Sequence, residues 1–420
     1  MARDHAAEAP APDVKQDPKE AAEPTTPHPE TPEKRSSSFM NFFASILGSK
    51  NPLAQPADPD THTVWLLDNT AYQPVAADGA SSPTATAEQP SWRAEVVACI
   101  FEREGRKDIG KLVATIADHI GLDGELGADE DSRQHIKQRV QPFLDQVAPS
   151  RTLTLEIAVD EPAQVHALGP SDRNGIVSQD VDLGAVDVDD GGVVRPQLQG
   201  FGPDPASMNT TFAAPEGWLV ISDIDDTIKY TQTREPTGIL RSTFADEPEP
   251  ITGMPQFYEH IEAELVPAWF YLSASPYNLY PFLHRFLREQ YPPGTLVLRD
   301  YAWMDVSGLI RSFTEKTHEY KVDRMEKIRR WFPRRRVLCI GDSTQEDPEA
   351  YADMYRRYPN WIHAIIIRKV TDVAHMEERN RPERFEQAFQ DVPAHVWTIF
   401  EDTRELHDFV DGLGMEDQAL

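Results

Sequence analysis

Acidic and hydroxyl side chains end three apolar runs in the second half of the chain. These ends read Asp223-Ile224-Asp225-Asp226-Thr227, Ser273-Ala274-Ser275 and Gly341-Asp342-Ser343, and Asp347 follows five residues after Asp342. Lys321 lies in the segment before the third run. A buried cluster of carboxylates is strongly unfavourable without a counter-charge, and a divalent cation held by carboxylate oxygens would supply one. If the three ends meet in the fold, they therefore predict a metal-dependent site.

The apolar runs alternate with segments of helical spacing from residue 206 onward. The runs are WLVISDID, AWFYLSAS, GTLVLRDY, RVLCIGDS and WIHAIIIRKV, and the helical segments are PYNLYPFLHRFLREQ, EYKVDRMEKIRRWF and PEAYADMYRRYP. Such alternation indicates right-handed crossovers and a parallel sheet covered on both faces. The active site of such a sheet lies beyond the carboxyl ends of its strands. The sequence thus predicts an α/β domain over residues 206–420 with its polar residues at one edge.

The polar residues resemble, in order, the four motifs of the haloacid-dehalogenase-like phosphatases. They are carried here by Asp223-x-Asp225-x-Thr227, by Ser273, by Lys321, and by Asp342 with Asp347. The strings SDIDDTIK, YLSASPYNLYPFL and CIGDSTQEDPEAYAD more narrowly resemble the fungal actin-patch phosphatidate phosphatases, which are related to the catalytic part of lipins. The resemblance implies a haloacid-dehalogenase-like Rossmannoid fold with a small cap, and hydrolysis of phosphatidate to diacylglycerol and phosphate.

The same resemblance implies a role for each catalytic residue. Asp223 would attack phosphorus to form an aspartyl-phosphate, which divides one difficult hydrolysis into two displacements. Asp225 would protonate the leaving oxygen and then activate water, with Thr227 orienting it. Ser273 and Lys321 would hold the transferring oxygens and stabilise their charge.

The resemblance also implies a Mg²⁺ site. Its ligands would be the carboxylates of Asp223 and Asp342 and the backbone carbonyl of Asp225, with water completing the oxygen shell. Asp347 is the further metal residue that we predict, although its position before a proline also suits a helix N-cap. Glu346 is the alternative to Asp347.

For two other predicted site residues, Lys321 and Ser273, the sequence offers alternatives close by. Lys321 shares an apolar helical face, which an ordinary surface lysine would avoid, but Lys316 and Lys327 lie close by. Ser275 stands before a proline and is predicted to be the N-cap of the next helix, which leaves the phosphate role to Ser273.

The segment between residues 230 and 253 is too short for a large cap domain. A lightly covered reaction centre admits a bulky substrate, such as a lipid headgroup at a bilayer, and Arg234 or Arg241 could meet its charge. We therefore predict a Mg²⁺-dependent phosphatidate phosphatase. The alternatives are a phosphatase for a soluble phosphomonoester or a phosphoprotein, and a scaffold recruited by SH3 domains in which catalysis is incidental.

Charge composition restricts the class of partner. The 420 residues include 41 Lys and Arg against 70 Asp and Glu, a formal net charge of −29, which argues against nucleic-acid binding through a general basic surface. Residues 311–336 are the local exception, with ten basic and four acidic side chains, and could attract an anionic membrane. Within them, the run Arg334-Arg335-Arg336 looks unneeded for folding.

The cysteines and the hydropathy indicate where the protein acts. Cys99 and Cys339 lie far apart in apolar runs, which is typical of buried reduced thiols in an intracellular protein. No run reaches the roughly 20 apolar residues of a membrane span, and the N-terminus lacks a secretory pattern. We predict a cytoplasmic protein, and the resemblance adds a peripheral membrane or cortical actin-patch location.

The first half of the chain divides into two predicted parts. Residues 1–60 are proline-rich and predicted to be a disordered tail, in which overlapping PxxP units from Pro24 to Lys34 fit an SH3 ligand. An apolar face over residues 39–47 predicts a short amphipathic helix, for a membrane interface or for a protein surface. Residues 61–205 are predicted to form a β-rich domain with one or two helices and no assigned role.

Overall fold

The computed structural model describes residues 53–75, 91–103, 109–121, 130–159, 162–202, 208–300, 311 and 316–418. The SH3 motif and the amphipathic helix over residues 39–47 lie outside these ranges, as does the predicted tail up to residue 52. The end of that tail is ordered. Strand β1 (Gln55–Pro56) pairs in parallel with β6 (Arg151–Ile157).

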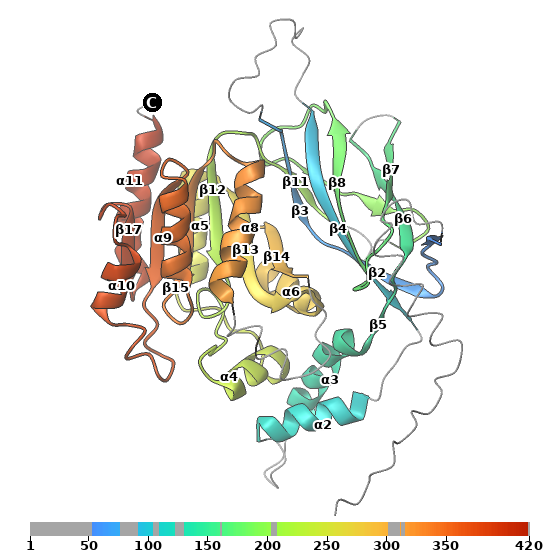
Figure 1. The fold of residues 1–420 in the computed structure, drawn as a ribbon, viewed down its shortest axis with the longest axis horizontal. Coiled ribbons are helices and arrows are strands. Elements are labelled where there is room, and N and C mark those ends of the chain that lie inside the picture. The colour runs from blue at the N-terminus through green and yellow to red at the C-terminus, as the bar shows by residue number, and fades with distance from the viewer. Residues whose placement is uncertain are drawn as a thin grey trace, which may run out of the picture. The chain divides into compact units, whose positions relative to one another are not determined.

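Six parallel strands form the central sheet of the second half of the chain (Figure 1). In spatial order they are β14 (Thr295–Arg299), β13 (Ala268–Pro276), β12 (Trp218–Asp223), β15 (Arg336–Asp342), β16 (Ile362–Arg368) and β17 (Trp397–Phe400). The strand β12 lies in the middle and is buried along its whole length. The predicted parallel α/β architecture is therefore confirmed.

Helices cover both faces of this sheet (Figure 1). They are α5 (Met254–Leu265), α6 (Tyr280–Gln290), α8 (Thr317–Trp331), α9 (Asp347–Arg357), α10 (Pro382–Ala388) and α11 (His407–Gln418). Side chains alternate along β12, so that Leu219 and Ile221 pack with α8 and α9, while Val220 packs with α5 and α6. This alternation gives the sheet one apolar core on each side.

The first half of the chain is rich in β-structure, as predicted. One sheet contains β2 (His62–Leu66), β3 (Asn69–Tyr72), β4 (Trp92–Glu102), β5 (Gln146–Val147), β8 (Ile176–Gly184), β9 (Val193–Val194) and β11 (Thr210–Phe212). The other contains β1, β6, β7 (Gln164–Leu168) and β10 (Gln197–Leu198). The strand β11 lies beyond residue 205 in the chain but pairs with β3 of the first sheet.

Two helices are inserted between β4 and β5, and they lie at the same end of the parallel sheet as α4 (Pro236–Leu240) (Figure 1). They are α2 (Ile109–His119) and α3 (Glu130–Leu144). The helix α3 contacts the π-helical turn Arg241–Ala245, and α2 contacts α4. A helical pair from the first half of the chain therefore packs on the short segment that follows β12.

The basic run Arg334-Arg335-Arg336 has a structural role that the sequence analysis missed. The Arg335 side chain is 1% exposed and donates hydrogen bonds to the carbonyls of Ala214 and Trp218, each at 2.7 Å. It also pairs with Asp190 at 2.7 Å. The prediction that this run is unneeded for folding is wrong, because Arg335 ties the start of β15 to the β-rich part of the chain.

The helix α8 uses most of its cations in internal contacts as well. Lys321 is buried, Lys327 pairs with Glu95 at 2.6 Å, and Arg324 pairs with Asp300 at 3.3 Å. Within the described part of residues 311–336, these contacts leave no continuous free cationic face on α8. Among the described helices, none combines the length and the apolar composition that crossing a bilayer requires.

Candidate active site

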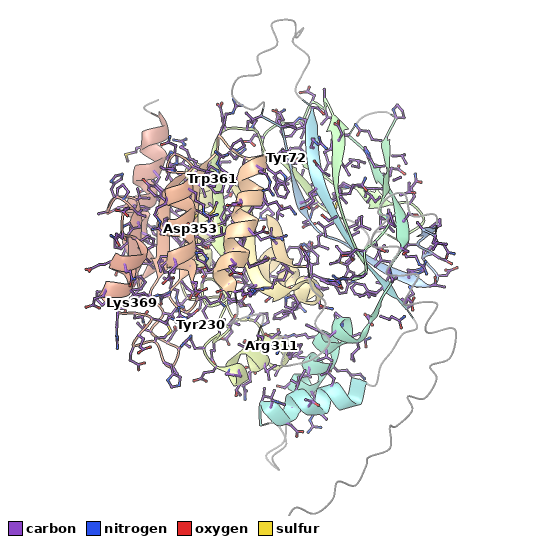
Figure 2. All side chains as sticks on the ribbon, in the orientation of Figure 1. Tyr72, Tyr230, Arg311, Asp353, Trp361 and Lys369 are labelled. Carbon is purple, nitrogen blue, oxygen red and sulfur yellow. The ribbon has the colours of Figure 1, made fainter. Side chains whose placement is uncertain are left out.

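The carboxyl edge of the parallel sheet brings the predicted residues together. Asp223 ends β12 and Asp342 ends β15, and these two strands are neighbours, as are β12 and β13, which carries Ser273. Tyr230 lies at this edge, whereas Trp361, which precedes β16, lies at the opposite end of the sheet (Figure 2). The topology therefore brings together Asp223, Ser273 and Asp342, which are far apart in the sequence.

Asp223 is held by two donors. The Lys321 ammonium lies 2.6 Å from Asp223 Oδ1, and the Thr227 hydroxyl donates to Asp223 Oδ2 at 2.9 Å. Lys321 also forms a short contact with Asp347, and Thr227 donates to Asp342 Oδ2 at 3.1 Å. All five residues are at most 1% exposed. One buried cluster is thus formed by Asp223, Lys321, Asp342 and Asp347.

This cluster has more negative than positive charge. Burial raises the pKa of Asp223 well above its usual range, and Asp347 and Asp342 raise it further against the opposing effect of Lys321. Burial, with the neighbouring Asp347 and Asp226, raises the pKa of Asp342 to about 7. The nearby carboxylates keep Lys321 protonated by raising its pKa against the effect of burial. One lysine does not neutralise three acids.

The geometry of these acids fits a cation. The carboxylate oxygens of Asp223, Asp342 and Asp347 lie within 4.8 Å of one another. Oxygen donors of this kind are the ligands that Mg²⁺ prefers, and a divalent ion would remove the charge imbalance.

The alternative ligand Glu346 points elsewhere. Its carboxylate accepts hydrogen bonds from the Thr317 hydroxyl and from the backbone N–H of His318, both at 3.2 Å, at the start of α8. Asp347 is the first residue of α9, and its carboxylate accepts a hydrogen bond from the Asp342 backbone N–H at 3.1 Å. Of the two, the structure brings Asp347 into the acidic cluster, and Glu346 caps α8.

Asp225 is positioned by different groups from those that the sequence analysis expected. The Ser273 hydroxyl donates to Asp225 Oδ2 at 2.6 Å, and the Thr231 hydroxyl donates to Asp225 Oδ1 at 2.9 Å. Thr227 instead contacts Asp223 and Asp342, so the expectation that it orients Asp225 is wrong. The prediction failed because Thr231, six residues beyond Asp225, returns to it only after the chain turns.

The prediction for Ser275 is also wrong. Strand β13 continues through Pro276, and the helical turn Tyr277–Leu279 that follows receives no side-chain cap. The Ser275 backbone N–H donates to the Ser273 hydroxyl oxygen at 3.0 Å. Ser275 therefore helps to fix Ser273, and it does so through its backbone.

Asp226 organises the loop beyond β12. Its φ is 61°, and its carboxylate accepts backbone hydrogen bonds from Thr231, Gln232 and Thr233 at 3.0, 2.7 and 2.7 Å. The Arg368 guanidinium donates to the Asp226 carbonyl at 2.8 Å. The sequence signal was the second acid of the DIDDT string followed by threonines, a pattern typical of a side chain that binds nearby backbone.

The other basic residues that the sequence analysis considered lie outside the cluster of Asp223, Asp342 and Asp347. Lys316 precedes α8 and pairs with Glu319 at 3.9 Å, while Lys327 pairs with Glu95. Arg241 pairs with Asp246 at 3.3 Å, and Arg234 is exposed. Of the lysines considered, Lys321 is the one in contact with Asp223.

The comparisons with known proteins concern this part of the chain. Residues 218–369 match the family model described as phosphatidate phosphatase APP1, catalytic domain. Phosphatidate phosphatase APP1 of Saccharomyces cerevisiae is 31% identical over 170 residues, which cover 39% of this chain and 28% of that protein. An uncharacterized protein of Schizosaccharomyces pombe is 28% identical over 159 residues, which cover 37% of this chain and 25% of that protein.

The matches therefore span about a quarter of the length of each relative. The family-model match over residues 218–369 includes β12, β13 and β15, which carry Asp223, Ser273 and Asp342. By sequence, the region 218–369 is therefore similar to the catalytic domain of the APP1 phosphatidate phosphatases.

Proposed function

We propose that the chain is a Mg²⁺-dependent phosphatidate phosphatase of the haloacid-dehalogenase-like type. The observation that carries the proposal is the buried contact of Asp223 with Lys321, beside Asp342 and Asp347, at the carboxyl edge of a parallel sheet. The similarity to the yeast protein, which is named phosphatidate phosphatase, supports phosphatidate as the substrate. The short segment over the catalytic edge, with only α4 and the π-helical turn Arg241–Ala245, supports a bulky substrate.

In the first step Asp223 attacks the phosphorus. An oxygen–phosphorus bond forms to its carboxylate, the bond from phosphorus to the glycerol oxygen breaks, and Asp225 gives a proton to that oxygen so that diacylglycerol leaves. Lys321, 2.6 Å from Asp223 Oδ1, would stabilise the negative charge on the transferring group. Ser273 holds Asp225 in position for the proton transfer.

In the second step water hydrolyses the aspartyl-phosphate. Asp225, now deprotonated, takes a proton from the water, whose oxygen attacks phosphorus, and the bond to Asp223 breaks. Phosphate leaves, and both carboxylates return to their starting states. The hydroxyls of Thr231 and Ser273 keep Asp225 in one place for both transfers.

Mg²⁺ would be held by Asp223, Asp342 and Asp347 together with the Asp225 backbone carbonyl. When bound, the ion supplies positive charge that offsets the charge of the phosphoryl oxygens and of the clustered acids. Thr227, which donates to both Asp223 and Asp342, keeps these two carboxylates side by side.

Membrane association and SH3 recruitment remain part of the proposal. Phosphatidate lies in a bilayer, so the enzyme would act as a peripheral protein at membrane surfaces. The proline-rich residues 24–34 would recruit SH3 domains and so direct it to a cytoplasmic site such as the cortical actin patch.

The test is phosphate release from phosphatidate in mixed micelles. We expect release that requires Mg²⁺ and stops with a chelator, and Asp223→Asn should lower the rate by more than about 1,000-fold because it removes the nucleophile with little change in volume. Asp353→Asn is the matched control, since Asp353 lies on α9 near Asp347 but pairs at the surface with Arg357 (Figure 2). A wild-type protein that releases no phosphate with any divalent ion would overturn the proposal.

A further inference from the structure

A second buried lysine lies next to the catalytic carboxylates. Lys229 is 1% exposed, and its ammonium donates to the Thr231 hydroxyl at 2.8 Å and to the Tyr230 carbonyl at 3.2 Å. The Phe282 ring covers it, with the ring centroid 5.8 Å from Nζ. A lysine is rarely buried so completely unless a specific partner needs its charge.

The contacts of Lys229 fix the direction of one hydroxyl. An ammonium can only donate, so the Thr231 oxygen must accept from Lys229. The single Thr231 proton is then free to point to Asp225 Oδ1, 2.9 Å away, whereas the Lys229 carbonyl is farther, at 3.4 Å. The chain from Lys229 through Thr231 to Asp225 is thus a directed row of hydrogen bonds.

A similar row reaches the other oxygen of the same carboxylate. The Ser275 backbone N–H donates to the Ser273 oxygen at 3.0 Å, and the Ser273 hydroxyl donates to Asp225 Oδ2 at 2.6 Å. Each Asp225 oxygen therefore receives one donor whose orientation is set by a group behind it. Rotation of the carboxylate would break both hydrogen bonds.

Opposing effects act on the charge of Lys229. Burial lowers its pKa and Arg139 lowers it as well, while the negative charges of Asp225 and Asp226 favour the ammonium form. Lys321 serves the nucleophile side of the site, in contact with Asp223 and Asp347. Lys229 lies on the Asp225 side.

We propose that Lys229 is a positioning residue that acts through Thr231 to hold Asp225 in the orientation that proton transfer requires. The inference rests on the proposed function, in which Asp225 gives a proton to the leaving oxygen and later takes one from water. Lys229 itself touches neither substrate nor the reacting atoms. Its loss should impair the two proton transfers and leave the attack by Asp223 intact.

The experiment compares two leaving groups. The glycerol oxygen of dioctanoyl phosphatidate needs a proton to depart, while p-nitrophenolate, a weak base, does not. The ratio kcat/KM includes only steps up to departure of the leaving group. Lys229→Met and Thr231→Val should therefore lower kcat/KM at least about 10-fold more for phosphatidate than for p-nitrophenyl phosphate, because positioned acid catalysis contributes at least this much. Thr231→Ser, which keeps the hydroxyl, should restore the phosphatidate value.

The second step gives an independent signal. If Asp225 is no longer oriented, the aspartyl-phosphate should be hydrolysed slowly, and Lys229→Met should release a burst of about one p-nitrophenol per enzyme before slow turnover. Lys369→Met is the matched control, because Lys369 pairs with Glu401 at 2.7 Å on the protein surface, and it should show neither effect.

Each outcome decides between the possibilities. Equal losses of kcat/KM for both substrates, without a burst, would mean that Lys229 is structural and would overturn the inference. A wild-type protein inactive on both substrates would overturn the proposed function and this inference with it. If the wild type cleaves p-nitrophenyl phosphate but not phosphatidate, phosphatidate is not its substrate. Glycerol 3-phosphate then replaces phosphatidate in the comparison of the variants, and the result decides the role of Lys229. Should Thr231→Val fail to fold, Lys229→Met decides alone.

Discussion

The buried acids at the carboxyl edge carry more negative charge than Lys321 offsets. Asp223, Asp342 and Asp347 are almost fully excluded from water, and Lys321 contacts two of them, Asp223 and Asp347. Each carboxylate that ionises without a further cation opposes the other two. The cation-free site is therefore more stable when at least one of these acids is protonated, and Asp342 has its pKa raised to about 7.

This arrangement predicts how stability depends on pH without metal. The pKa of Asp342 is higher in the folded protein than the ordinary 3.8, so the folded state binds its proton more tightly than the unfolded state. Its contribution to the free energy of unfolding is fully present below about pH 4 and is lost as the pH rises through about 7. With a chelator present, the melting temperature of Asp342→Asn should thus exceed that of the wild type at pH 8 by more than at pH 5.

Thermal unfolding at the two pH values measures this difference. The comparison of variant with wild type cancels the general effect of the net charge of −29, which both proteins share apart from one group. Excess Mg²⁺ should raise the melting temperature of the wild type at pH 8. A wild-type-to-variant difference that is the same at both pH values would contradict the raised pKa.

Sequence analysis located the residues at strand ends but not those that depend on the path of a loop. Asp223 and Asp342 were predictable because parallel strands end at one edge, and the apolar runs mark where each strand stops. The roles of Asp226 and Thr231 depend on a turn in which Asp226 has a φ of 61° and its carboxylate binds three later backbone N–H groups. No apolar periodicity marks such a turn.

The helix α3 contacts the segment over the catalytic edge directly. Arg139 donates hydrogen bonds to the carbonyls of Thr243 and Asp246, and His135 contacts the Ala245 carbonyl at 3.0 Å. Glu247 completes the contact, with one carboxylate oxygen 3.0 Å from His135. The sequence predicted helices in this region from their spacing, but not their partner, since about 100 residues separate α3 from residues 241–247.

Arg139→Ala should therefore loosen the segment over the active site. The variant leaves two backbone carbonyls without their donor, at an expected loss of about 1–3 kcal/mol locally. Amide hydrogen exchange across residues 241–247 should accelerate, and kcat/KM for phosphatidate should fall because the segment over the site is held less firmly. Arg133→Ala, an exposed position on the same helix, is the control. Unchanged exchange at residues 241–247 would show that α3 does not hold this segment.

At the scale of the molecule, one apolar cluster spans part of the β-rich region and one face of the parallel sheet within residues 53–418. Trp65, Phe101 and Ile136 belong to the same apolar cluster as Val220 and Phe257. Polar contacts cross the same boundary, as in the hydrogen bond of 2.7 Å between Thr70 and Thr295. Sequence analysis treated these parts as separate because each has its own pattern of apolar residues. The cores merge through tertiary contacts that local patterns do not encode.

A shared core predicts that the described region unfolds as one unit. Scanning calorimetry should show a single transition for both parts, since exposure of one would expose the apolar surface of the other.

Arg335→Met should shift that single transition to lower temperature by removing the buried contacts with Ala214, Trp218 and Asp190, an expected loss of about 2–3 kcal/mol. Arg334→Met is the neighbouring control, because Arg334 is half-exposed and lies 3.6 Å from Glu216, and it should change the transition little. Two resolved transitions in the wild type, or a shift in only one part of the molecule, would mean that the parts are thermodynamically independent. In that case the packing of α3 on the segment over the catalytic edge would be a contact between autonomous domains, and it would be open to regulation by their separation.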